Sequence, residues 1–298
     1  MIKYEWRNSL SEAESTELAD LLHRAAEYDA EPEYTTIDFR DVEYAMAQPD
    51  SLSHHLLVWM LPYATALGER DRPERIAALL RITGSGNGFG EASLVVDPDL
   101  RSIGIVTLLL ERVGLDTSAP SGWLGTGVHT LTAWAQGNHP ATGRISNRFL
   151  IPRTRRVWKL IRATDSFEDA TSAPVLEPTS VSALEDLGWA SGLPATAACH
   201  ALREGGRVIG AVALDLAPVS SEEFGACATV RSVASAPNAD ARHRKQLLNG
   251  AAAIAHEAGR TGLIIHVDSD DSGLVNACRL ANFQHDRTDV LLQLGGHA

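Results

Sequence analysis

The chain has 298 residues, enough for two domains of ordinary size, and its 44% hydrophobic and 21% charged residues are typical of a folded globular protein. The formal net charge of −12 repels nucleic acid and anionic membranes, so neither is expected as a partner. No apolar run approaches the roughly 20 residues that are needed to cross a bilayer, and the N-terminal residues do not have the pattern of a signal peptide.

The three cysteines are Cys199, Cys227 and Cys278. They have neither the spacing of metal ligands nor the even number of a disulfide framework. We therefore expect no metal site, and we expect a reducing, cytoplasmic environment.

The first half of the chain has the pattern of a mixed α/β unit. A capping box of Ser11 and Glu14 begins an N-terminal helix whose leucines share one face. We expect helices at residues 11–28, 103–113 and 140–149. We expect strands at residues 55–61, 75–83, 91–96, 129–134 and 155–161. The last of these strands is expected to complete the first unit.

The second half repeats much of this order after a linker. Residues 164–179 contain Asp, Ser, Pro and Thr with few large apolar side chains. We expect helices at residues 180–189, 239–258 and 271–281. We expect strands at residues 197–203, 208–216, 229–235, 263–267 and 287–294. The pattern predicts a domain at residues 1–163, a linker at 164–175 and a second domain at 176–298.

A candidate phosphate-binding loop lies between the strand at 91–96 and the helix at 103–113. The turn Asp97-Pro98-Asp99 is followed by Arg101, Gly104 and Val106 in an Arg-x-x-Gly-x-Val pattern. The first turn of a helix has unpaired N–H groups and a positive end, and a glycine lets phosphate oxygens approach the backbone. The alternative interpretation is a strand–turn–helix with an incidental glycine.

A second motif follows at Ala133–Ala141, with the sequence A-W-A-Q-G-N-H-P-A. It resembles the A-W-A-H-G-N-x-P-A run in the N-terminal half of the mycothiol synthase family. This family consists of tandem GNAT acetyltransferases of about this length. Within this run, Gly137 and Asn138 are expected to form a turn, and we assign no catalytic role to His139.

The resemblance implies two tandem GNAT domains, each an α/β unit with a mixed, mostly antiparallel sheet flanked by helices. It also implies transfer of an acetyl group from acetyl-CoA to a small-molecule amine, the cysteinyl amine of a glucosaminyl-inositol precursor. The coenzyme-binding residues that it implies are Leu94, Val95, Val96, Arg101, Ser102, Ile103, Gly104, Ile105 and Val106. Val106 departs from the family pattern, which has Gly or Ala at that position.

The second copy departs further from the family pattern. Aligned on Pro237, both glycine positions of the phosphate loop are occupied, by His243 and Lys245. The acidic strand residue of the family falls on Thr229, and its substrate lysine falls near Asp215. The basic run at 242–245 either holds phosphate by charge or is a solvated turn in a domain that no longer binds coenzyme.

Two residues are candidates for acid–base chemistry. Cys278 stands where the family has the tyrosine that protonates the leaving thiolate, and it is either a general acid or a small buried hydrophobe. Glu91 is the acid on the first-copy strand, one residue out of register with the expected base. The sequence therefore indicates an acetyltransferase, or alternatively an inactive tandem GNAT protein that binds coenzyme in its first domain and acts as a scaffold.

Overall fold

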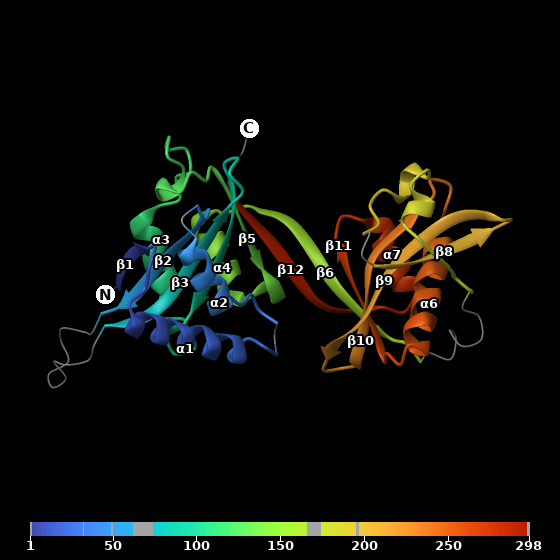
Figure 1. The fold of residues 1–298 in the computed structure, drawn as a ribbon, viewed down its shortest axis with the longest axis horizontal. Coiled ribbons are helices and arrows are strands. Elements are labelled where there is room, and N and C mark those ends of the chain that lie inside the picture. Colours follow the sequence, from blue (N-terminus) through green and yellow to red (C-terminus); the bar gives the residue numbers. More distant parts are fainter. Residues whose placement is uncertain are drawn as a thin grey trace. The chain divides into compact units, whose positions relative to one another are not determined.

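The computed structural model describes residues 2–31, 33–48, 50–61, 74–165, 174–194 and 197–296. The chain forms two compact units (Figure 1). The first unit contains Met1–Arg155 together with Asp289–Ala298, and the second contains Arg156–Thr288. No helix in these described ranges is long and apolar enough to span a membrane.

The sheet of the first unit has the strand order β1-β2-β3-β4-β5-β12. These strands are β1 (Ile2–Arg7), β2 (Ser53–Met60), β3 (Arg75–Gly84), β4 (Phe89–Val96), β5 (Thr130–Ala135) and β12 (Gln284–Gly295). All neighbours are antiparallel except β4 and β5, which are parallel.

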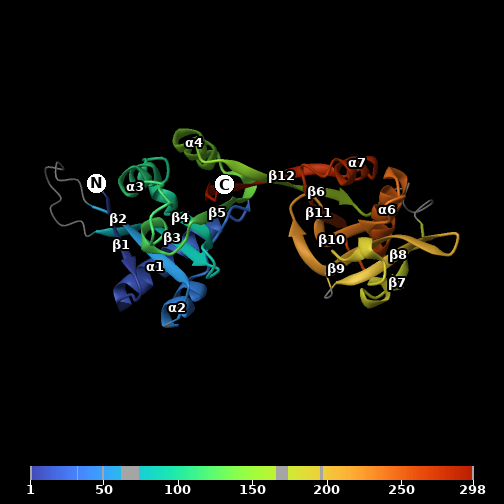
Figure 2. The same cartoon turned by 90° about the horizontal axis from the view of Figure 1, so that it is seen from above.

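Helices cover both faces of this sheet, as Figure 2 shows. One face carries α1 (Glu12–Tyr28) and α2 (Phe39–Ala47), and the other carries α3 (Ile105–Val113) and α4 (Pro140–Phe149). The alternation of side chains in β4 separates two cores. Val95 packs with the α1 side chains Leu18 and Leu21, whereas Ala92 packs with Leu109 of α3.

The sheet of the second unit has the order β6-β11-β10-β9-β8-β7. These strands are β6 (Arg153–Ala163), β11 (Gly262–Asp268), β10 (Gly225–Ser235), β9 (Arg207–Ser221), β8 (Ala198–Glu204) and β7 (Glu177–Thr179). Only β10 and β11 are recorded as a parallel pair among these described strands. The helices α6 (Ala241–Glu257) and α7 (Ser272–Leu280) pack against it around Leu247, Leu248 and Cys278.

The predicted fold class is confirmed, since both sheets are mixed and mostly antiparallel. One assignment differs from expectation. The strand expected to complete the first copy, β6, pairs with β11 in the second unit, from Val157 to Ala163. The last strand, β12, pairs with β5 in the first unit, from Val290 to Gly295. Side-chain alternation predicts a strand, but it does not specify which sheet edge the strand will join.

Some elements were not expected from the sequence. The strand β1 and the helix α2 lie in segments without a predicted element, and β7 falls in the expected linker. Residues 166–173 of that linker lie outside the described residues. The helix expected at 180–189 is replaced by two 3-10 turns, Ser182–Leu184 and Gly188–Ala190. A glycine inside so short a segment disfavours an α-helix.

Candidate functional site

A gap between β4 and β5 is the central feature of the first unit. The two strands pair only from Phe89 to Glu91 on β4 and from Thr130 to Thr132 on β5. Beyond Glu91 and Thr132 the strands separate, and a cavity of about 800 Å³ opens between them, lined by Ala92 and Ala133 among others. We call it the splay cavity. Backbone groups of β4 on this side are thus available to a ligand that enters the gap.

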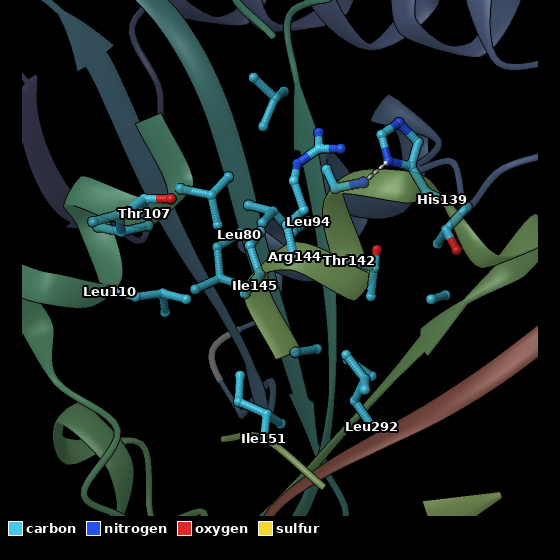
Figure 3. Close-up of a pocket in the computed structure, with 18 of the residues that line it drawn as sticks. Leu80, Leu94, Thr107, Leu110, His139, Thr142, Arg144, Ile145, Ile151 and Leu292 are labelled. Atoms are coloured by element: carbon cyan, nitrogen blue, oxygen red, sulfur yellow. Dashed lines mark hydrogen bonds between the residues drawn. The ribbon is translucent and has the colours of Figure 1, made fainter. Parts of the chain in front are cut away.

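The helices α3 and α4 form the walls of the splay cavity, and most of its lining is apolar (Figure 3). Leu94 comes from β4, Leu110 from α3, Ile145 from α4 and Leu292 from β12. Polar side chains, such as that of Arg144, line the cavity as well. This arrangement fits a long ligand that has an apolar arm and a polar or charged end.

The loop from β4 to α3 is held by ion pairs to a buried carboxylate. Asp97 is fully buried and accepts hydrogen bonds from Arg24 at 3.0 Å and from Arg75 at 2.5 Å. Burial alone would raise the pKa of Asp97, but the bonds from these two guanidinium groups hold that pKa below its usual value. The predicted turn at Asp97-Pro98-Asp99 is therefore held by one arginine from α1 and one from β3.

Arg101 fixes the next part of the loop. Its guanidinium donates two hydrogen bonds to the carboxylate of Asp29, at 2.6 and 2.7 Å, and its Nε donates to the carbonyl of Val96 at 3.1 Å. The bond to Asp29 raises the pKa of Arg101, so its positive charge is permanent. Arg101 lines the splay cavity, but its charge is already paired, and we infer that it positions the loop.

The N-terminus of α3 is open. Gly104 is its N-cap residue with φ 88°, and no side chain of the described residues caps the helix. A Cβ atom built at Gly104 would meet no atom within 4 Å. Ser102 also has a positive φ of 65°. The first-turn N–H groups of α3 therefore point into accessible space, as a phosphate site requires.

The structure places eight of the nine predicted coenzyme residues along the splay cavity, the exception being Ile103. The eight are Leu94, Val95, Val96, Arg101, Ser102, Gly104, Ile105 and Val106. The side chain of Ile103 is instead 56% exposed and is not among the lining residues. The role of all nine residues in binding coenzyme stays a prediction.

His139 lies at the splay cavity but has a structural function. Its Nδ1 accepts a hydrogen bond from the backbone N–H of Ala141 at 3.1 Å and so caps α4, as the dashed line in Figure 3 shows. Burial, and then the charge of Arg101, lower the pKa of His139. The ring packs edge-on against Tyr34, with a centroid distance of 4.5 Å.

Glu91 lies on the opposite face of the sheet from the splay cavity. Because side chains alternate along β4, Glu91 and Ser93 face the α1 and α2 side, while Ala92 and Leu94 face α3. A second, more open cavity of about 510 Å³ is lined there by Glu91, Ser93 and Thr132. Glu91 pairs with Thr132 at the last position before the strands separate, so it stands beside the gap.

The equivalent helix terminus of the second unit is closed. The Asp240 carboxylate accepts hydrogen bonds from the N–H groups of Arg242 and His243, and His243 Nδ1 accepts one from the N–H of Asp240. Arg244 donates to Ser235 at 3.2 Å, and its guanidinium occupies the space beside Gly273. The amides that a phosphate would use are therefore already satisfied by the protein.

Cys278 is fully buried in the second unit, and burial raises the pKa of its thiol to about 12. This environment fits the interpretation of Cys278 as a small hydrophobe. Thr229 is also buried, at 8% exposure. Three residues that shape the first unit were not identified from the sequence, namely Asp29, Asp97 as an ion-pair acceptor, and Arg81. Their partners are distant in the chain, so no local pattern could reveal them.

The chain is similar to known proteins in part of its sequence and in the whole of its fold. No protein-family model matches it. It is 34% identical over 115 residues to a mycothiol acetyltransferase of Nocardioides sp., which is 38% of this chain and 36% of that protein. It is 28% identical over 123 residues to a mycothiol acetyltransferase of Paenarthrobacter aurescens, 41% of this chain and 35% of that protein. The matched segments thus span about a third of the length of these relatives.

Two solved structures align over nearly the whole chain. One is a tandem GNAT protein from the clavulanic acid biosynthesis pathway, with TM-score 0.59 and 13% identity over 100% of this chain and 99% of that one. The other is a GCN5-related N-acetyltransferase from Sphaerobacter thermophilus, with TM-score 0.56 and 14% identity over 98% and 95%. The resemblance inferred from the sequence is confirmed: this chain has the fold of the tandem GNAT proteins and is related in part of its sequence to the mycothiol acetyltransferases.

Proposed function

We propose that the chain is a GNAT-type N-acyltransferase that binds acetyl-CoA in its first unit and transfers the acetyl group to a small-molecule amine. One observation carries the proposal. The gap between β4 and β5 opens into a cavity of about 800 Å³, directly beside a helix N-terminus that no side chain caps.

Each part of acetyl-CoA has a counterpart in this arrangement. The N–H groups at the start of α3 and the left-handed Gly104 suit a pyrophosphate. The free backbone edge of β4 suits the pantetheine amides, and the apolar walls suit the arm between them. The thioester would then lie near Glu91 and Thr132, where the strands separate.

The chemistry needs a base for the amine and a polarised thioester carbonyl. Glu91 lies beside the gap, on the face of the sheet opposite to the splay cavity. Its carboxylate acts as the base and takes a proton from the incoming ammonium group. Backbone N–H groups of the separated strand stabilise the oxyanion that develops on the carbonyl oxygen. The proton that leaves the nitrogen when the C–N bond forms is transferred to the departing thiolate of CoA.

The name of the relatives, mycothiol acetyltransferase, indicates the pathway of their acceptor. By analogy, the cysteinyl amine of the glucosaminyl-inositol precursor is the first acceptor to test, in a protein that we expect in the cytoplasm. The second unit has a helix terminus closed by Asp240 and a buried Cys278. We therefore place the transfer in the first unit.

Calorimetric titration with acetyl-CoA tests this proposal directly. We expect one molecule bound per chain, and a crystal structure with the coenzyme should place it between α3 and α4. Binding of acetyl-CoA only to the second unit, or no binding at all, would contradict the proposal. Binding without release of CoA for any amine would favour the inactive scaffold instead.

A further inference from the structure

The open cavity on the α1 and α2 face carries both a cation and an anion. It is lined by Arg81 and Thr83 of β3, Glu91 and Ser93 of β4, and Thr132 of β5. We call these five residues the polar groove. Its volume of about 510 Å³ is ample for a small metabolite. It lies where β4 and β5 separate, on the opposite face from the splay cavity.

Arg81 is the cation of the polar groove, and its charge is only loosely paired. Its Nε is buried and has no hydrogen-bond acceptor among the described residues. Its ion pair with Asp41 spans 3.7 Å, and the Asp41 side chain is 67% exposed. By contrast, Arg101 holds Asp29 at 2.6 Å. A guanidinium whose recorded counterion among the described residues is an exposed carboxylate at 3.7 Å can still bind another anion through its terminal N–H groups.

The neighbour of Arg81 on β2 does not neutralise it. His55 pairs with Arg81 across the two strands and is only 2% exposed. Burial, and then the charge of Arg81, lower the pKa of His55 to about 4, so its ring is neutral near pH 7. Its Nε2 is also buried without a partner in the described part of the chain. The cross-strand pair of His55 and Arg81 therefore carries a single positive charge near pH 7, at Arg81.

Glu91 is the anion of the polar groove. Among the described residues its carboxylate has no hydrogen-bond or ion-pair partner, and no ion pair joins it to Arg81. The register pairs Arg81 with Ser93 and Thr83 with Glu91, so Arg81 and Glu91 are diagonal neighbours. Diagonal neighbours in an antiparallel pair lie about 7–8 Å apart at their Cα atoms. Two opposite charges at this spacing, with hydroxyl groups between them, complement a small zwitterion.

We propose that the polar groove binds the acetyl acceptor and that this acceptor is an α-amino acid, with its ammonium group at Glu91 and its carboxylate at Arg81. The inference rests on the proposed function, because the acetyl donor must come from the splay cavity. Glu91 takes one ammonium proton, the amine nitrogen bonds to the acetyl carbon, and the C–S bond of acetyl-CoA breaks. The second nitrogen proton goes to the CoA thiolate, and the products are an N-acetyl amino acid and CoA.

Steady-state release of CoA thiol, measured with a panel of free amino acids, their carboxamides and their decarboxylated amines, tests this inference. The wild-type protein should acetylate at least one amino acid with a kcat/KM about ten- to hundredfold above that of its carboxamide, the range that a charge-assisted hydrogen bond supplies. Arg81→Gln should raise the KM of the amino acid by a similar factor and leave the KM of the carboxamide unchanged. The control is Arg40→Gln, which removes the same charge from an exposed position on α2 and should change neither KM.

The outcomes separate this inference from the proposed function. Failure to bind acetyl-CoA in calorimetry would overturn the proposed function, and the acceptor inference with it. Binding of acetyl-CoA with equal turnover of amino acid and carboxamide, or with no turnover of any amino acid, would overturn the acceptor inference alone. Equal effects of Arg81→Gln and Arg40→Gln would also overturn it. The comparison of substrates on the wild-type protein remains decisive even if Arg81→Gln does not fold.

Discussion

Replacement of Gly104 by Asp should abolish coenzyme binding without unfolding the protein. Gly104 has φ 88° and precedes the open N-terminus of α3. Nothing lies within 4 Å of the Cβ position, so the new side chain meets no steric obstacle. Asp is among the residues that visit this left-handed conformation, and its carboxylate would cap the free N–H groups of Val106 and Thr107.

The size of the effect follows from charge. A carboxylate placed about 4 Å from one phosphate charge costs about 4 kcal/mol at an effective dielectric constant of about 20. Competition for the same N–H groups adds to this cost. Because exposure to solvent weakens the repulsion, we expect a loss of at least about 2.7 kcal/mol, a hundredfold rise in the Kd of CoA.

Calorimetry with CoA measures the effect, and two controls isolate its cause. Gly104→Asn has the same shape without the charge, so it should weaken binding less than Gly104→Asp does. Gly205→Asp makes the same change in the exposed turn between β8 and β9, far from the proposed phosphate site in the sequence, where φ is 57° and the Cβ position is also free. It should leave the Kd unchanged. A Kd for Gly104→Asp within threefold of the wild-type value would refute the placement of the pyrophosphate.

Three further predictions concern stability and reactivity. The pKa of His55 is about 4 in the folded protein and 6.5 in the unfolded chain, so the unfolded chain takes up the proton first as the pH falls. The contribution of His55 to the unfolding free energy should therefore be at its maximum above pH 7, and about 3 kcal/mol of it should be lost by pH 4. In urea denaturation, the unfolding free energy of His55→Gln should lack this fall between pH 7 and pH 4. The same dependence on pH in the wild-type and variant proteins would contradict the prediction. Cys278, with its thiol pKa raised to about 12 by burial, should react with a thiol reagent only after unfolding, and rapid labelling of the native protein would show that the site is open. Asp29→Asn should lower the unfolding free energy by about 3 kcal/mol, because it leaves the charge of Arg101 unpaired; an unchanged midpoint in thermal denaturation would argue against this.

Local patterns predicted the elements that form the site. The β-branched run before Asp97 became β4, and the Arg-x-x-Gly loop leads into α3 as expected. What local patterns could not predict was the role of Arg101. Its partner Asp29 lies 72 positions earlier in the chain, at the C-cap of α1, and no motif marks it. The motif therefore located a strand–loop–helix, and the structure adds that the charge of Arg101 is already paired with Asp29; its contact with coenzyme stays a prediction.

The polar groove has the same limitation. Arg81 and Glu91 lie on two separate strands, and each alone is ordinary: Arg81 is partly buried and Glu91 is exposed. Only the register of β3 against β4 makes them diagonal neighbours. The sequence put Glu91 one residue out of register with the expected base, but it could not show which face of the sheet Glu91 would occupy, since one residue changes the face. The structure puts Glu91 on the face opposite to the splay cavity.

The last prediction concerns the activity that the relatives' name suggests. We expect little turnover, below about 1 s⁻¹, with the cysteinyl precursor of mycothiol as acceptor. The resemblance puts the family's acidic strand residue at Thr229, which is buried and accepts no proton at neutral pH. It puts the residue that protonates the thiolate at Cys278, whose thiol pKa is raised to about 12 by burial.

Each missing acid–base group is worth about 10²–10⁴-fold in rate, and the losses need not simply add. The closed terminus of α6, where Asp240 takes the place of a phosphate, removes the coenzyme site as well. Asp240→Ala therefore provides a matched test, because it reopens those N–H groups at a cost of about 1 kcal/mol of stability. It should not restore turnover, since Thr229 and Cys278 are unchanged. Turnover above about 1 s⁻¹ in the wild-type protein would show that the first unit accepts this precursor or that other residues of the second unit perform the chemistry.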